Sequence, residues 1–307
     1  MNTKSRSFVA VDILLIIMMI LPLLLGIALK VLTTPASDGI AITGARIFFV
    51  IPMPIQDLPI TESQINSALV LITISAICLY MTHGLKVHPE LKRQHIAEWA
   101  IEKVDGLVKD SMGEYFTSFA PFIAAILALS ALSSFTSLIG LYPPTSDLNV
   151  VAGWAILVFG LITYYKFKCG PWGYVKSFAE PVALLTPMNI ISEVATPISM
   201  AFRHYGNVLS GTVIAALVAV GLQGASSLVF GALPGFLGDF PFLQVGIPAV
   251  LSIYFDVFSG ALQAYIFAML TMLYVSGAFP EEEYIQRKLK KKAKKENKTK
   301  NKKAEVI

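Results

Sequence analysis

Six apolar stretches, most of them long enough to cross a lipid bilayer, constrain this sequence more than any other feature. They lie at about residues 8–29, 65–82, 116–141, 150–165, 188–222 and 242–278. A helix needs about 20 apolar residues to span the hydrocarbon core of a membrane. A soluble domain would carry about 25% charged residues, whereas this chain carries 14%. The pattern predicts an all-α integral membrane protein with about six membrane helices.

The chain is predicted to divide into three parts. Residues 1–63 hold the first membrane helix and an irregular, proline-rich outside loop with a short interfacial piece near 47–52. Residues 64–280 form the main helical domain, and residues 281–307 form a basic tail whose polar composition predicts disorder. A cleaved signal peptide is the alternative for the first stretch, although about 20 apolar residues exceed a usual signal core.

Basic residues are distributed unevenly between the two sides of the membrane. With six spans, the N-terminus, the 86–113 connector, the 166–177 loop and the tail lie on one side and hold almost all of the 24 Lys and Arg residues. The opposite side holds only Lys30 and Arg46. Because cytoplasmic loops are enriched in Lys and Arg, the C-terminus is predicted to be cytoplasmic. The tail is interpreted as a topology signal attracted to anionic lipid, with nucleic-acid binding as the weaker alternative.

The last two apolar stretches are longer than an upright helix requires. About 35 helical residues reach about 50 Å, which exceeds the ~30 Å hydrocarbon core. We therefore expect these helices to be strongly tilted, kinked or extended beyond the bilayer, with Pro197 and Pro248 as candidate kink sites. The glycine-rich link at 223–241 is short, so the two helices are predicted to form a hairpin.

Arg203 lies near the middle of the fifth apolar stretch. An arginine at the bilayer centre costs at least ~2.5–3.5 kcal/mol, so it is expected to face protein or a water-filled cavity. Its guanidinium stays protonated in proteins, which suits a fixed cation and not a proton carrier. Asn207 follows one turn later on the same face, and Gly206 with Ser210 permits close approach of another helix. Snorkelling and a buried ion pair are the alternatives.

Other polar residues interrupt the last two stretches. Glu193 lies ten residues before Arg203 and is either part of an ion pathway or a carboxylate at the membrane boundary. The sixth stretch carries polar residues at spacings of 4, 3 and 4, which places them along one helix face: Ser252, Asp256, Ser259 and Gln263. Such a stripe does not suit lipid. Together with Arg203 on the partner helix, it predicts an aqueous path for ions.

The sequence has none of the motifs of a self-contained enzyme, such as a phosphate-binding glycine loop, a nucleophile elbow or a zinc helix. Its two cysteines and four histidines form no disulfide framework and no metal-ligand spacing. We therefore expect no catalytic residue, no metal and no cofactor. Two other functions remain open. One is a secondary transporter that binds an anion at Arg203, although no inverted repeats support it; the other is a non-conducting scaffold.

Three ordered motifs resemble those of the a subunit of F-type ATP synthases. The family usually has an Arg-Leu-Phe/Tyr-Gly-Asn core, a Gln-Ala-Phe/Tyr-Ile-Phe signature in its final helix and a Pro-Thr-Ser/Ala-Asp-Leu/Val-Asn segment before its middle span. The matching segments here are Arg203-His204-Tyr205-Gly206-Asn207, Gln263-Ala264-Tyr265-Ile266-Phe267 and Pro144-Thr145-Ser146-Asp147-Leu148-Asn149. His204 replaces the usual leucine. Asp147 is also a candidate helix cap. The resemblance covers roughly residues 64–278, and the added N-terminal span departs from the commonest five-span form.

The resemblance implies a stator ion channel that couples H+ or Na+ flow to ATP synthesis. Arg203 would face a rotating ring of c subunits and favour the ionised form of the ring carboxylates. Gln263 would lie near Arg203 at the ring, and Asp256 and Asn207 would line the half-channel to the outside. Glu193 would serve the cytoplasmic half-channel. The family often has an ionisable residue where Thr212 stands, so Asp256 would act alone.

The resemblance also implies supporting polar residues and partners. The supporting residues are Ser252, Ser259, Asp147 and Asn149. The implied partners are the c-ring, the b subunits of the peripheral stalk, the lipid bilayer and, indirectly, the F1 sector, with no nucleic acid. The implied location is the plasma membrane of a bacterium. The choice between H+ and Na+ stays open, because in this family it rests mainly on the c subunit.

Overall fold

The structure is a computed structural model that describes residues 3–33, 44–54, 56–87, 91–179, 182–231 and 242–279. Within these ranges, six helical segments are long and apolar enough to cross a membrane: Phe8–Thr33, Glu62–Thr82, Glu114–Ile139, Leu148–Lys168, Ala183–Phe230 and Val250–Gly277. The predicted all-α integral membrane protein is thus confirmed. The predicted tail at 281–307 and residues 232–241 of the predicted link lie outside the described residues.

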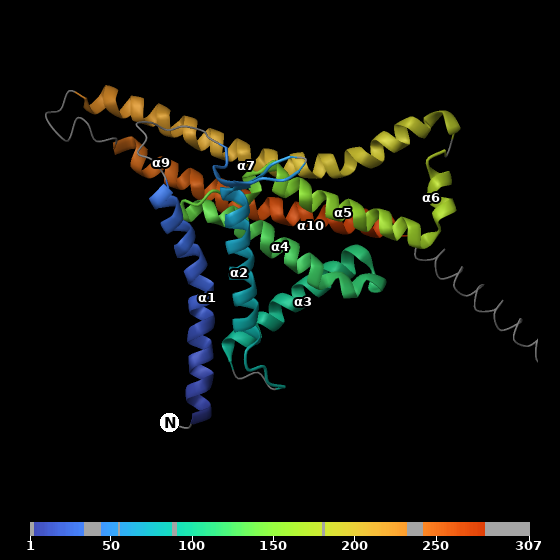
Figure 1. Cartoon of the computed structure of the whole chain (residues 1–307), viewed down its shortest axis with the longest axis horizontal. Helices are drawn as coiled ribbons and strands as arrows, with labels where there is room; N and C mark the ends of the chain where they lie inside the picture. The colour runs from blue at the N-terminus through green and yellow to red at the C-terminus, as the bar shows by residue number, and fades with distance from the viewer. Residues whose placement is uncertain are drawn as a thin grey trace, which may run out of the picture.

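The N-terminal part contains more regular structure than predicted. Helix α1 (Thr3–Thr33) packs along α2 (Glu62–Thr82), as Figure 1 shows. Between them, β1 (Ile47–Ile51) and β2 (Leu58–Thr61) pair antiparallel, with Ile51 opposite Leu58. The prediction of an irregular loop is wrong here, because the β-branched and aromatic residues of β1 favour an extended strand.

An ion pair fastens α1 to the segment that follows α2. The Asp12 carboxylate lies 2.8 Å from Nη1 of Arg93 and 2.9 Å from Nδ1 of His83. The Arg93 guanidinium also lies over the rings of Phe8 and Tyr80, at 5.4 and 4.8 Å from their centroids. These contacts hold the N-terminal helix against the part of the chain that builds the helical bundle.

The bundle itself consists of the remaining helices. They are α3 (Lys92–Met112), η1 (Glu114–Phe119), α4 (Ala120–Phe135), η2 (Thr136–Ile139), η3 (Pro144–Ser146), α5 (Leu148–Cys169), α6 (Pro171–Ser177), η4 (Ala183–Leu185), α7 (Thr186–Phe230), α9 (Phe242–Ser252), η5 (Ile253–Ser259) and α10 (Gly260–Gly277). Asp147 caps α5 by accepting a hydrogen bond from the Asn149 backbone N–H at 2.9 Å, which confirms the predicted cap.

The two long C-terminal segments differ from each other in their continuity. Helix α7 has 45 residues and continues through Pro197 without a break. The sixth segment changes from α9 to the π-helix η5 before it resumes as α10. A π-helix has i→i+5 hydrogen bonds and often occurs at functional sites. Periodicity along the sequence could not reveal this change, because it assumes the same turn throughout.

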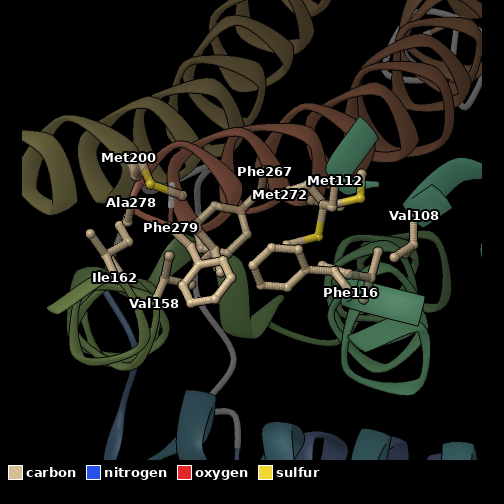
Figure 2. Close-up of a cluster of buried hydrophobic side chains, with 14 of the residues drawn as sticks. Val108, Met112, Phe116, Val158, Ile162, Met200, Phe267, Met272, Ala278 and Phe279 are labelled. Atoms are coloured by element: carbon tan, nitrogen blue, oxygen red, sulfur yellow. The ribbon is translucent and has the colours of Figure 1, made fainter. Parts of the chain in front are cut away.

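A buried apolar cluster holds α10 in the centre of the bundle. It joins Val108 and Met112 of α3, Phe116 of η1, Met200 of α7 and Phe267 of α10, among other residues. Figure 2 shows these side chains meeting between the helices. Because such interiors are close-packed, the cluster fixes the position of α10 relative to α7, and the two helices carry most of the predicted site.

Candidate functional site

Two contacts define how α7 and the last helix lie against each other. Nδ2 of Asn207 donates to Oγ of Ser259 at 2.9 Å, and the same hydroxyl lies 3.1 Å from Oδ1 of Asn207. Four residues further along α7, a Cβ added to Gly211 would lie 3.2 Å from Cβ of Phe255. The two helices therefore run antiparallel here, and a position four residues later in α7 lies level with a position four residues earlier in the last helical segment. One step in the other direction places Arg203 level with Gln263.

Arg203 and Gln263 share a level but not a face. Arg203 is exposed on α7, and within the described ranges its guanidinium has no hydrogen-bond or ion-pair partner. Gln263 is only 4% exposed. This burial differs from the predicted contact of Gln263 with a ring. Helix α10 packs closely on α4, so the Gln263 side chain faces the bundle interior. At this level the exposed residue is thus the cation, and the buried residue is the amide.

Asp256 lies within the π-helix and is half-buried. The hydroxyl groups of Ser137 of η2 and of Ser252 are the polar neighbours of its carboxylate. Thr212 makes a local bond, from Oγ1 to the Leu209 carbonyl at 2.8 Å. Asp256 and Ser252, two members of the predicted polar stripe, therefore lie together in the structure. Ser137 is a third polar residue at this place, and it was not predicted from the sequence.

A row of hydroxyls on α4 is the main polar feature that sequence reasoning did not find. Ser130 and Ser134 are 0% and 3% exposed, and Ser137 follows on the same face. Oγ of Ser134 donates to the Ser130 carbonyl at 3.2 Å and lies 3.5 Å from Oγ1 of Thr145. Oγ of Ser130 lies 3.3 Å from Nε2 of His204. The spacing of 4 and 3 was visible in the sequence and matches the spacing used for the sixth stretch.

Near the start of α5 the chain forms a second polar group around Asp147. The Ser63 hydroxyl donates to its carboxylate, and Nδ2 of Asn66 donates to the Tyr142 carbonyl at 2.8 Å. Burial raises the pKa of the Tyr142 hydroxyl, and the nearby Asp147 charge adds to the effect. Asn149 is exposed. Ser134 connects this group to the sixth segment, because its Oγ lies 3.5 Å from Oγ1 of Thr145 in η3 and its side chain lies against Gly260.

Glu193 lies on the other side of Arg203, in an ion pair. Nζ of Lys166 lies 2.6 Å from both oxygens of the Glu193 carboxylate, and the Tyr174 hydroxyl donates to Oε1 at 3.3 Å. Burial raises the pKa of the Tyr174 hydroxyl, and the negative charge of Glu193 raises it further. A cavity of about 210 Å³ adjoins the pair, with Thr196 and Tyr274 in its wall. This position of Glu193 fits both alternatives, a member of an ion pathway and a carboxylate at the membrane boundary.

The Glu193→Gln substitution separates these alternatives. It removes the charge that pairs with Lys166 while keeping the shape of the side chain. A hydrogen bond to a charged group contributes about 1.5–3 kcal/mol, so we expect a lower melting temperature of the purified complex and a severalfold slower ion flux. The Lys166→Met/Glu193→Gln double variant should recover stability but not flux. Recovery of both in proteoliposomes would show that the carboxylate serves only as the partner of Lys166.

No cluster of three or more His, Cys, Asp or Glu side chains in the described ranges could hold a metal ion. The polar groups instead fall into two clusters on opposite sides of the Arg203 level. One contains Asp256, Asn207 and Ser259, and the other contains Glu193 and Lys166. Fixed dipoles and charges of this kind can line water-filled channels that approach Arg203 from two sides. By themselves they do not make or break covalent bonds.

The sequence is similar to that of known proteins over most of its length. The sequence profile of the ATP synthase A chain family matches residues 65–276. The sodium ion specific ATP synthase subunit a of Propionigenium modestum is 27% identical over 277 residues, which cover 80% of this chain and 88% of that protein. ATP synthase subunit a of Priestia megaterium is 32% identical over 238 residues, covering 72% and 94%, and that of Desulforamulus reducens is 33% identical over 213 residues, covering 67% and 75%. The chain therefore belongs to the ATP synthase A chain family, the ion-conducting subunits of the membrane F0 sector.

Proposed function

We propose that this chain carries H+ or Na+ to and from a c-ring through two half-channels that are separated by Arg203. The observation that carries the proposal is the exposed arginine on α7, with one polar cluster on each side of its level. An ion that enters from one cluster must transfer to a site on a partner before it can leave through the other. A rotating ring of carboxylates provides that transfer.

The outside half-channel is assigned to the cluster around Asp256. Ser252, Ser259 and Asn207 extend it toward α7, and Asp147 and Asn149 lie near its mouth. The Asp256 carboxylate is the ionisable group of this cluster, and Thr212 makes only a local hydrogen bond. Because the Asp256 carboxylate lies beside hydroxyl groups, it suits the temporary binding of a cation or the passage of a proton.

The cytoplasmic half-channel is assigned to Glu193 and the adjoining cavity. The distribution of basic residues supports a cytoplasmic C-terminus, and the C-terminal end of α10 lines this cavity. The Lys166–Glu193 pair holds the carboxylate in place near the exit. Both half-channels then end at the same exposed face of α7.

At that face, Arg203 acts as a fixed cation. A unit charge about 4 Å from a carboxylate interacts with it by about 4 kcal/mol at an effective dielectric constant of 20. A ring carboxylate therefore releases its ion as it reaches Arg203. The same charge repels cations, so it prevents direct leakage between the half-channels. Gln263, buried at the same level, is assigned to the support of this region and not to the ring surface.

The arrangement of the helices suits contact with a curved ring. In Figure 1, α1 and α2 cross the direction of α7 and α10 steeply. If α1 and α2 stand upright in the bilayer, the α7–α10 hairpin is strongly tilted. The 45 residues of α7, at about 1.5 Å each, would then present a long side to the ring instead of protruding from the membrane.

The proposed partners are the c-ring, the b subunits of the peripheral stalk and, through them, the F1 sector, in the plasma membrane of a bacterium. The complex is tested by reconstitution with and without this chain. ATP synthesis under an imposed H+ or Na+ gradient should require the chain. A secondary transporter, which the family assignment does not favour, would instead take up one solute without the partner subunits. Uptake of that kind, with synthesis unaffected by omission of the chain, would contradict the proposal.

A further inference from the structure

His204, which follows the exposed Arg203, is buried in the bundle. Its side chain is 0% exposed. Consecutive residues of an α-helix are about 100° apart around the axis. A contact that fixes the direction of His204 therefore also fixes the direction in which Arg203 leaves the helix.

Three helices hold the imidazole. Oγ of Ser130 on α4 lies 3.3 Å from Nε2. Trp154 of α5 and Phe267 of α10 meet the ring edge-on, at centroid distances of 5.8 and 5.4 Å. These neighbours carry no charge, and the adjacent Arg203 points away from them. Nδ1 is buried and has no hydrogen-bond partner among the described residues.

The bond to Ser130 is therefore the polar constraint on this part of α7. Apolar and aromatic contacts tolerate small rotations and shifts of a helix, whereas a hydrogen bond weakens steeply with distance and angle. A buried polar atom that loses its partner is costly. The Ser130 hydroxyl thus selects one depth and one rotation of α7 at the level of Arg203.

We propose that His204 is the positioning residue of Arg203, and that it acts through Ser130 to hold the guanidinium toward the c-ring. This inference rests on the proposed function of Arg203. A leucine at position 204 fills a similar space but leaves the rotation of α7 without a polar anchor. The cation would then spend part of its time away from the ring carboxylate, which lowers coupling and admits leakage.

The test compares Gln, Asn and Leu at position 204. A glutamine amide reaches the place of Nε2, whereas an asparagine amide reaches only the place of Nδ1. We expect His204→Gln to keep ATP synthesis within about twofold of wild type, and His204→Asn and His204→Leu to lower it about fivefold to tenfold, as for loss of one buried hydrogen bond. Passive ion leak through F0 vesicles should rise in the same two variants.

Substitutions on α4 supply the matched controls. Ser130→Ala should reproduce the His204→Leu phenotype, and the double variant should be no worse than either single one, because both remove the same bond. Ser133→Ala removes another fully buried α4 hydroxyl, one without a hydrogen-bond partner in the described part of the chain, and should have no effect. Co-purification of the c-ring measures assembly in every variant.

Several results would overturn the proposal. Equal activity of the Gln and Asn variants would show that Nε2 is not the relevant atom, and additive effects of Ser130→Ala and His204→Leu would show that the two side chains act separately. If His204→Leu does not assemble, the Gln–Asn comparison and Ser130→Ala decide the question. If Arg203→Ala loses coupling but all of these variants behave like wild type, only the role of His204 is overturned. If Arg203→Ala is unaffected, the proposed function itself is overturned.

Discussion

Arg203→Ala is expected to abolish coupled ATP synthesis while the complex still assembles. The side chain is exposed on α7 and has no hydrogen-bond or ion-pair partner in the described ranges, so its removal leaves no buried partner unsatisfied. What is lost is the attraction to a ring carboxylate. About 4 kcal/mol at 4 Å corresponds to about three orders of magnitude in the ionisation equilibrium, and we expect synthesis to fall by at least about 100-fold.

The measurement is gradient-driven ATP synthesis in proteoliposomes, together with passive ion flux through F0 alone. Flux should persist or rise, because the barrier between the half-channels is gone. Arg203→Lys retains a charge on a shorter, less extended head group and should keep a small part of the activity. Lys103→Ala, which removes a charge from the exposed side of α3, is the control and should synthesise ATP normally. Full synthesis by an assembled Arg203→Ala complex would falsify the assigned role.

Gly260→Val is expected to prevent the bundle from packing. Gly260 begins α10 where that helix touches α4, and an added Cβ would lie 2.7 Å from Cβ of Ser134 and 3.2 Å from its Oγ. The obstructing atom belongs to a short side chain on a helix, so it cannot swing away. Overpacking costs about 1–3 kcal/mol for added methylenes, and valine adds three carbons at this contact. We expect loss of folded complex, and a lower melting temperature for Gly260→Ala.

Thermal unfolding of the detergent-purified complex, followed by size-exclusion chromatography, measures this effect. Gly153→Ala on α5 is the matched control, since an added Cβ there meets nothing within 4 Å and alanine favours the helix. Combining Gly260→Ala with Ser134→Gly should restore part of the lost stability, because it removes the obstructing side chain. Equal melting temperatures for Gly260→Ala and Gly153→Ala would show that the helices separate at little cost.

Much of the architecture could be predicted from sequence because lipid imposes strict requirements. Membrane-spanning segments must be long and apolar, and their backbone groups must be paired internally. The six helices therefore follow from the six apolar stretches of the sequence. Arg203 was equally conspicuous, since a charge in an apolar helix is costly anywhere. The boundaries shifted, however: α7 extends from Thr186 to Phe230, beyond the predicted 188–222, because the predicted bounds followed the continuous apolar run and the helix also includes the polar and small residues that flank it.

The missed features depend on contacts between helices. Ser130 and Ser134 are weakly polar and fit an apolar stretch, so their spacing was visible in the sequence but their burial against His204 and Thr145 was not. Gln263 was assigned to a polar stripe, but periodicity gives a helix face and does not say which neighbour covers that face. The assignments of Arg203, Asp256, Asn207 and Glu193 to ion transfer stay predictions until the variants are measured.

The π-helix at Ile253–Ser259 has a consequence for how this chain tolerates changes in length. A π turn accommodates one more residue than an α turn in nearly the same rise. Deleting a single residue within it would therefore restore α-helical winding while leaving α10 seated on α4, whereas the same deletion inside α10 would rotate every buried side chain beyond it. The segment therefore behaves as a one-residue insertion, and it contains Asp256, the one carboxylate within Phe242–Gly277.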